Sequence, residues 1–280
     1  MAGTDGRKVS NWWTVWGVLI LVWALFPLLW MFSLSFKDPD TFRSAAPTFF
    51  PKDWVWDNYK TVFTDSLFTS ALRNSVGIAL IATALAVVIA MFAAYAIARM
   101  DFPGKKLLLS MALAIAMFPQ AALVGPLFNM WRNLGIYDTW IGLIIPYLTF
   151  ALPLSIWTMS AFFRQIPWEM EQAAQVDGAT AWQAFRKVII PLAAPGVFTT
   201  AILTFFFCWN EFLLAISLTS TDRARTVPAA LSFFTGASQF QSPITYIMAA
   251  SVVVTIPVVI LVLVFQRRIM AGLTAGAVKG

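Results

Sequence analysis

Long apolar runs are the feature of this sequence that most restricts its fold. A helix needs about 20 mostly apolar residues to cross a bilayer core, and six runs of that length occur in the 280 residues. They lie at 13–36, 74–98, 107–131, 139–163, 196–220 and 243–265. Only 11% of the residues are charged, against roughly 25% in soluble domains. The sequence therefore predicts one all-α integral membrane domain that crosses the bilayer six times. The first run exceeds the roughly 7–15 apolar residues of a signal peptide, so we expect it to be retained.

The composition excludes several kinds of function. The chain has no histidine and a single cysteine, Cys208, so an intrachain disulfide cannot form and the usual metal ligand and general base are missing. We expect no metal site and no catalytic residues. A net charge of +6 is compatible with nucleic acid, but basic flanks of the cytoplasmic loops explain it better.

The positions of the basic residues orient the spans. Six spans place both termini on one side, and 11 of the 19 lysines and arginines lie on that side. Several of them form close pairs beside the spans, whereas aspartates dilute those on the opposite side. The positive-inside rule then places both termini and the loop 164–195 in the cytoplasm. Prolines within the spans favour a pathway that opens and closes, although transmembrane helices also tolerate proline without such a role.

The segment 164–195 is polar, unlike the runs on either side of it. Pro167 suits the first turn of a helix, because its missing N–H would have no partner there. The residues WEMEQAAQV favour a helix, and Gly178 supplies the left-handed residue that often ends one. Thr180 and Gln183 have the spacing of a capping box, which begins a second helix. We therefore predict two short helices that meet at a tight turn.

Small residues leave the corner of this hairpin with almost no side-chain bulk. From composition, two interpretations of what the hairpin contacts stay open. A bare corner fits a groove on another protein, with Trp182 and Phe185 as aromatic anchors. Alternatively, the two helices lie on the bilayer surface, with Arg186 and Lys187 beside lipid phosphates.

The residues EQAAQVDGATAWQAFRKVIIPLAAPG resemble the EAA loop in permeases of binding-protein-dependent ABC importers. The stretches MFPQAALVGPLFNMW, GLIIPYLTFALPLSIWTMSAFFRQIPWEME, WNEFLLAISLT and QRRIMAGLTAGAVKG resemble the carbohydrate (maltose/trehalose) group of that family. The resemblance covers Pro27 to Gly280 and implies the type I ABC importer permease fold in the inner (plasma) membrane. One departure is Gln172, where the family usually has a glutamate directly before Ala-Ala; Glu171 stands one position earlier.

The resemblance also implies partners and contact residues. The loop 164–195 would be a coupling helix that docks on a cytoplasmic ATPase subunit, and the tail 266–280 would reach the same partner as a flexible peptide. The expected contact residues are Glu171, Gln172, Ala173, Ala174, Asp177, Gly178, Ala179, Trp182, Phe185, Gly272, Thr274 and Gly276. Further expected partners are a second homologous permease, an extracytoplasmic sugar-binding protein and membrane lipid. The expected solute is trehalose or a related disaccharide.

Energy for transport has to come from outside this chain. The P-loop pattern G-x-x-x-x-G-K-[ST] is absent, since PGKKL lacks the first glycine and the hydroxyl residue. ATP and Mg²⁺ would therefore bind to the ATPase dimer. Alternatives are an importer permease for another solute, an ion-coupled transporter or a membrane enzyme. An ion-coupled transporter typically has ionisable residues along several spans, and an intramembrane hydrolase needs paired catalytic polar residues. Only one span here contains a carboxylate, Glu211.

Polar residues within the spans are candidates for contact with the solute. They are Gln120, Asn129, Trp209, Asn210 and Glu211. The amides also suit hydrogen bonds that only bridge helices. Two interpretations of Glu211 stay open, a hydrogen-bonded tie between spans and a contact in the pore or its gate.

We predict that cysteines introduced at Ser10 and Thr274, in a Cys208→Ala background, react with an impermeant thiol reagent only from the cytoplasmic face. A cysteine at Asp53 should react only from the opposite face. The measurement is labelling of intact cells compared with inverted membrane vesicles. The opposite pattern would reverse the orientation of loop 164–195 and remove its access to a cytoplasmic ATPase.

Overall fold

The computed structural model describes residues 11–39, 48–234 and 244–277, with side chains described for 12–39, 48–234 and 244–265. The described residues form helices and no strands, as the apolar runs predict. They group into two compact units, one from Met1–Asp65 and Phe234–Thr255, the other from Ser66–Phe233 and Ile256–Gly280. Four helices are long and apolar enough to cross a membrane singly, and two bent helix pairs raise the number to six if each pair is one span.

The first unit holds α1 (Asn11–Ser35) and α2 (Asp57–Thr64). The buried Asn58 amide donates to the backbone oxygens of Ser35 and Lys37, each at 2.9 Å. The Phe36 ring packs against the Trp56 ring, with 4.8 Å between the ring centroids. These contacts hold α2 against the end of α1. The polar loop expected at 37–73 therefore contains a helix.

The core of the second unit is formed by three helices, α3 (Ser66–Arg99), α6 (Trp140–Gln165) and α10 (Ala194–Asn210), which pack on one another. Ala82, Ala86, Ala90 and Ala94 recur every four residues on α3, and all four are fully buried. A stripe of small residues lets two helix backbones approach closely in lipid, where hydrophobicity alone does not drive association. The second span begins at Ser66, earlier than the expected residue 74.

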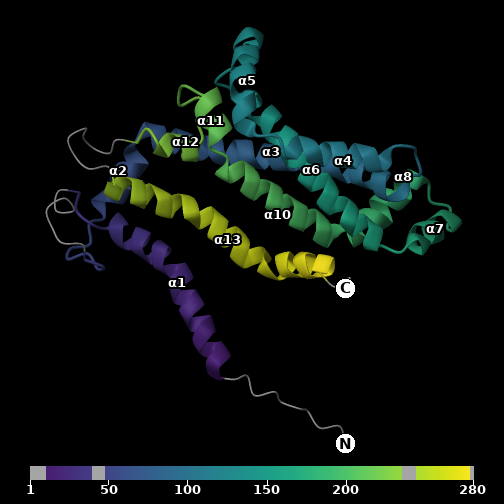
Figure 1. The fold of residues 1–280 in the computed structure, drawn as a ribbon, viewed down its shortest axis with the longest axis horizontal. Coiled ribbons are helices and arrows are strands. Elements are labelled where there is room, and N and C mark those ends of the chain that lie inside the picture. Colours follow the sequence, from purple (N-terminus) through teal and green to yellow (C-terminus); the bar gives the residue numbers. More distant parts are fainter. Residues whose placement is uncertain (1–10, 40–47, 235–243, 278–280) are drawn as a thin grey trace, which may run out of the picture. The chain divides into compact units, whose positions relative to one another are not determined.

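The third expected span, 107–131, is not one straight helix. It consists of α4 (Lys105–Ala116) and α5 (Gln120–Leu134), which meet at an angle of 87°. Pro119 explains the break, because it has no N–H to donate and its ring clashes with the preceding turn of a helix. Figure 1 shows α5 turned away from the direction of α4.

The second bent pair is Ala181–Leu192 with Ala194–Asn210, at an angle of 72°, so it begins before the fifth expected span, 196–220. That expected span is not one helix either. Helix α10 ends at Asn210, and the short α11 (Leu213–Leu218) follows after Glu211 and Phe212. The loop expected at 221–242 contains α12 (Val227–Leu231), which packs on α3.

The last helix, α13, is longer than expected. It runs from Ile244 to Ala277 without interruption, whereas the sequence predicted a span that ends at 265 and a flexible tail over 266–280. The backbone of Gly272, Thr274 and Gly276 is therefore helical, because residues such as Ala271, Leu273 and Ala275 between the glycines favour a helix. Gly280 lies outside the described residues.

Candidate functional site

The polar segment folds as the hairpin that the sequence predicts. Helix α7 (Trp168–Val176) follows Pro167, and α8 (Ala181–Ala184) follows Thr180. The chain turns at Gly178, whose φ of 86° is left-handed. The capping box is present in both directions, since Gln183 N donates to Thr180 Oγ1 at 3.3 Å and Thr180 N donates to Gln183 Oε1 at 2.9 Å. After α8 the helix continues through a π-helical turn (Phe185–Ile189) and α9 (Ile190–Leu192).

The base of the hairpin is tied to α3 by a buried carboxylate. Glu171 is 4% exposed, and its Oε2 lies 3.6 Å from Arg99 Nε. The Tyr95 hydroxyl donates to Glu171 Oε1. Arg99 Nη2 also donates to the Ile166 backbone oxygen at 2.8 Å, and its guanidinium lies 5.1 Å from the centre of the Trp168 ring. Arg99 thus holds the start of the hairpin at three points.

Two residues expected to touch a partner lie inside this chain instead. Glu171 is occupied by Tyr95 and Arg99, as described above. Phe185 is 3% exposed and belongs to a core cluster with Phe163 and Ile189. Its ring centroid is 4.6 Å from that of Tyr95. Both side chains are buried within this chain, and their contact with a partner stays a prediction. The apolar spacing of Phe185, Ile189 and Ala193, four residues apart, was the signal for a buried helix face.

The corner of the hairpin remains open to its surroundings. Gln172, Ala173, Asp177 and Gly178 are exposed, and Ala174 and Ala179 are half-buried. Trp182 is 56% exposed, and its ring stacks on that of Phe92 with 6.1 Å between centroids. Val176, which the sequence analysis did not single out, is 87% exposed. A Cβ at Gly178 would meet no atom within 4 Å. The base of the hairpin is thus held against α3 by side-chain contacts, whereas its corner consists of small, mostly exposed residues. The side chain of Thr274 and the surroundings of Gly272 and Gly276 lie outside the described side chains.

The residues proposed for solute contact differ in their surroundings. Trp209 is buried and stacks on Phe205, whereas Gln120 is half-buried at the start of α5. Asn129 and Asn210 are exposed. Helix α5, which carries Gln120 and Asn129, packs on α11, whereas α10, which carries Trp209 and Asn210, packs on α3 and α6.

Glu211 has a structural role at the break between α10 and α11. Its carboxylate is buried, and it accepts hydrogen bonds from Leu214 N at 2.8 Å and Ala215 N at 3.0 Å. The first N–H groups of a helix have no partner within the helix, so this side chain satisfies two of them. These bonds cap α11 locally and do not join two spans, so both the tie between spans and the contact in the pathway stay predictions.

A polar cluster at the other end of α3 was missed by the sequence analysis. Asn74 Nδ2 donates to the backbone oxygens of Asp222 at 2.9 Å and Arg225 at 3.0 Å. Ser75 Oγ accepts from Val227 N at 2.7 Å. Asp138 accepts from Ser220 N at 3.0 Å. Asn74, a polar residue at the edge of the apolar run 74–98, was the feature of the sequence that could have indicated this cluster.

We predict that Arg99→Met loosens the hairpin, because it leaves the Glu171 carboxylate buried without its cation. Breaking one side of a buried ion pair costs about 3–5 kcal/mol. The measurement is hydrogen exchange of the amides in 168–184, which should become much faster, together with a lower melting temperature in detergent.

The matched control is Arg132→Met, which removes an exposed arginine and should change neither readout. Adding Glu171→Leu to Arg99→Met should restore part of the lost stability, since no charge is then left buried. Equal exchange in Arg99→Met and the unaltered chain would contradict the tie.

We further predict that Glu211→Leu lowers the melting temperature, because it leaves two buried N–H groups unpaired at about 1–3 kcal/mol each. Glu211→Gln keeps one carbonyl acceptor and should lose about half as much. A variant Glu211→Gln that retains full stability but loses transport would show instead that the charge acts in the pathway.

Comparison with known proteins identifies the family. Residues 86–274 match the family described as the binding-protein-dependent transport system inner membrane component. The trehalose transport system permease protein SugB of Mycobacterium tuberculosis (strain CDC 1551 / Oshkosh) is 56% identical over 98% of this chain and 100% of that protein. The trehalose/maltose transport system permease protein MalG of Thermococcus litoralis is 40% identical over 94% of each chain.

The fold agrees with these sequence matches. A chain in the crystal structure of a bacterial ABC transporter involved in the import of the acidic polysaccharide alginate superposes with a TM-score of 0.77 and 25% identity. The match covers 95% of this chain and 98% of that chain. Together these comparisons confirm the resemblance read from the polar hairpin: the chain belongs to the binding-protein-dependent transport system inner membrane components.

Proposed function

We propose that this chain is a permease subunit of an ATP-driven importer for trehalose or a related disaccharide. It would form half of the translocation pathway beside a second, homologous permease. The relatives named for trehalose and for trehalose/maltose support the substrate class. A relative from Agrobacterium fabrum is a sulfoquinovosyl glycerol permease at 40% identity, so a different sugar-containing solute is the second candidate.

The hairpin α7–α8 is the proposed docking element for a cytoplasmic ATPase dimer, which would bind ATP and Mg²⁺. The observation that carries this proposal is the bare, left-handed corner at Gly178 on a base fixed to α3. An exposed corner without large side chains fits into a groove, and Val176 and Trp182 present apolar surface beside it. Gln172 and Asp177 supply polar contacts at the rim.

Transmission of movement follows from where the hairpin is fastened. Because Arg99 and Tyr95 belong to α3, a displacement of α7 by a partner pulls on that helix directly. Helices α6 and α10 pack on α3, so they would move with it. ATP binding by the partner would thereby alter the arrangement of the spans. An extracytoplasmic binding protein would deliver the sugar at the opposite end of α3, in the orientation that the basic residues favour.

We predict that Gly178→Val abolishes uptake of labelled trehalose and releases the ATPase subunit during co-purification. A valine at this position blocks the corner and strains a left-handed turn by about 1–2 kcal/mol. Gly135→Val is the matched control, because Gly135 also has a left-handed φ, 71°, and an open surrounding but lies in the loop after α5. It should lose similar stability and keep the ATPase.

Gln172→Ala should have a milder effect, since it removes at most one neutral hydrogen bond worth about 0.5–1.5 kcal/mol. Normal co-purification and normal uptake in Gly178→Val would refute the docking role. Uptake by the unaltered chain without any ATPase subunit would favour an ion-coupled transporter. Uptake of another sugar but not trehalose would leave the docking role intact and change the substrate.

A further inference from the structure

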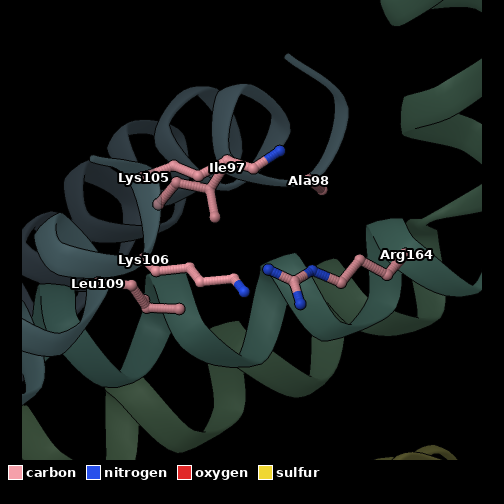
Figure 2. Close-up of a pocket in the computed structure, with 6 residues that line it drawn as sticks. All are labelled: Ile97, Ala98, Lys105, Lys106, Leu109 and Arg164. Carbon is pink, nitrogen blue, oxygen red and sulfur yellow. The ribbon is translucent and has the colours of Figure 1, made fainter. Parts of the chain in front are cut away.

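A small basic cavity lies where three helices of the second unit meet. Its volume is about 240 Å³, and it is lined by Ile97, Ala98, Lys105, Lys106, Leu109 and Arg164. The first two residues end α3, the next three begin α4, and Arg164 lies in the last turn of α6 (Figure 2). Two of the three long side chains in this cavity point across it toward each other. These are the Lys106 amine and the Arg164 guanidinium, as Figure 2 shows.

Of the three cations, Lys105, Lys106 and Arg164, only Lys105 has a carboxylate partner among the described side chains. Lys105 Nζ lies 2.9 Å from Asp101 Oδ1, and this ammonium holds the pKa of the Asp101 carboxyl below its ordinary value. Among the side chains that the structure describes, no carboxylate lies within 4.0 Å of the charged nitrogens of Lys106 or Arg164. The first turn of α4 contains no acidic residue either. Two like charges that face one cavity repel each other, and an anion between them removes that repulsion.

The surroundings of the cavity point to an amphipathic anion. No residue of α4 is buried. The exposed Leu107 and Leu108 follow directly after the two lysines, and the exposed Met111 lies one turn further on. In a membrane this helix therefore offers apolar surface to acyl chains immediately beside the cationic cavity. Basic pockets between transmembrane helices at the cytoplasmic side suit the phosphate of an anionic lipid.

We propose that Lys106 and Arg164 form a binding site for the headgroup phosphate of an anionic glycerophospholipid. Lys106 and Arg164 hold the phosphate from two helices, and the acyl chains lie along α4. A bound lipid thereby bridges the start of α4 and the end of α6, close to the point where the chain leaves the membrane for the hairpin. The site does not depend on which solute is carried or on how the ATPase docks.

The test is native mass spectrometry of the purified full chain, co-expressed with its partner subunits and titrated with dioleoyl phosphatidylglycerol or dioleoyl phosphatidylcholine. The unaltered protein should retain one phosphatidylglycerol more tightly than phosphatidylcholine, and added salt should weaken this binding. Each basic side chain near an anionic headgroup contributes roughly a factor of five. The variant Lys106→Gln/Arg164→Gln should therefore bind that lipid about 20–30-fold more weakly.

The matched control is Lys60→Gln/Arg132→Gln, which removes two exposed cations outside the cavity and should leave the affinity unchanged. Both double variants should keep the melting temperature of the unaltered protein when no lipid is added, which shows that they fold. Three results would overturn the proposal. They are equal phosphatidylglycerol binding in all proteins, displacement of the lipid by inorganic phosphate at equal concentration, and loss of a partner subunit from Lys106→Gln/Arg164→Gln with lipid binding unchanged.

Discussion

The contact between Glu171 and Arg99 is the one on which the arrangement of the hairpin depends. Moving a carboxylate and a guanidinium out of water costs desolvation free energy. The attraction between the two charges offsets this cost only when further hydrogen bonds satisfy both groups. Here the Tyr95 hydroxyl donates to the carboxylate, and the Ile166 backbone oxygen accepts from the guanidinium. Glu171 Oε2 and Arg99 Nε, 3.6 Å apart, form the ion pair without a further hydrogen bond. The pair therefore fixes α7 in one position on α3. Without this ion pair, few contacts would hold the short polar helix α7 at one position beside the apolar spans.

Helix α3 is fastened at both of its ends by polar contacts. Arg99 holds the hairpin at one end, and Asn74 and Ser75 hold the loop around residues 222–227 at the other. Figure 1 shows α7 and α8 near one end of α3 and α12 near the other. No proline interrupts its 34 residues, so the backbone ladder is continuous. Among the described residues, α3 is thus a stiff connection between the two polar regions.

The sequence predicted the features that rest on local chemistry. The apolar runs located the helices, and the turn at Gly178 and the capping box at Thr180 depend on neighbouring residues alone. Side-chain partners distant in sequence were not predictable in this way. Nothing near Glu171 indicates that Arg99, 72 positions earlier, would bury it. Phe185 was taken for an exposed anchor because composition does not show which helix face meets α3. The break at Pro119 was missed because proline kinks some spans and divides others.

The break between α10 and α11 also explains why a carboxylate lies within an apolar run. A helix that ends inside a membrane leaves N–H and C=O groups without water, so each break needs an internal partner. At the α4–α5 break, Pro119 has no N–H to satisfy. At the α10–α11 break, Glu211 accepts from two N–H groups. Each oxygen of the Glu211 carboxylate thus has a backbone N–H partner within the fold. Asn129 and Asn210 are exposed, and their contact with a sugar stays a prediction.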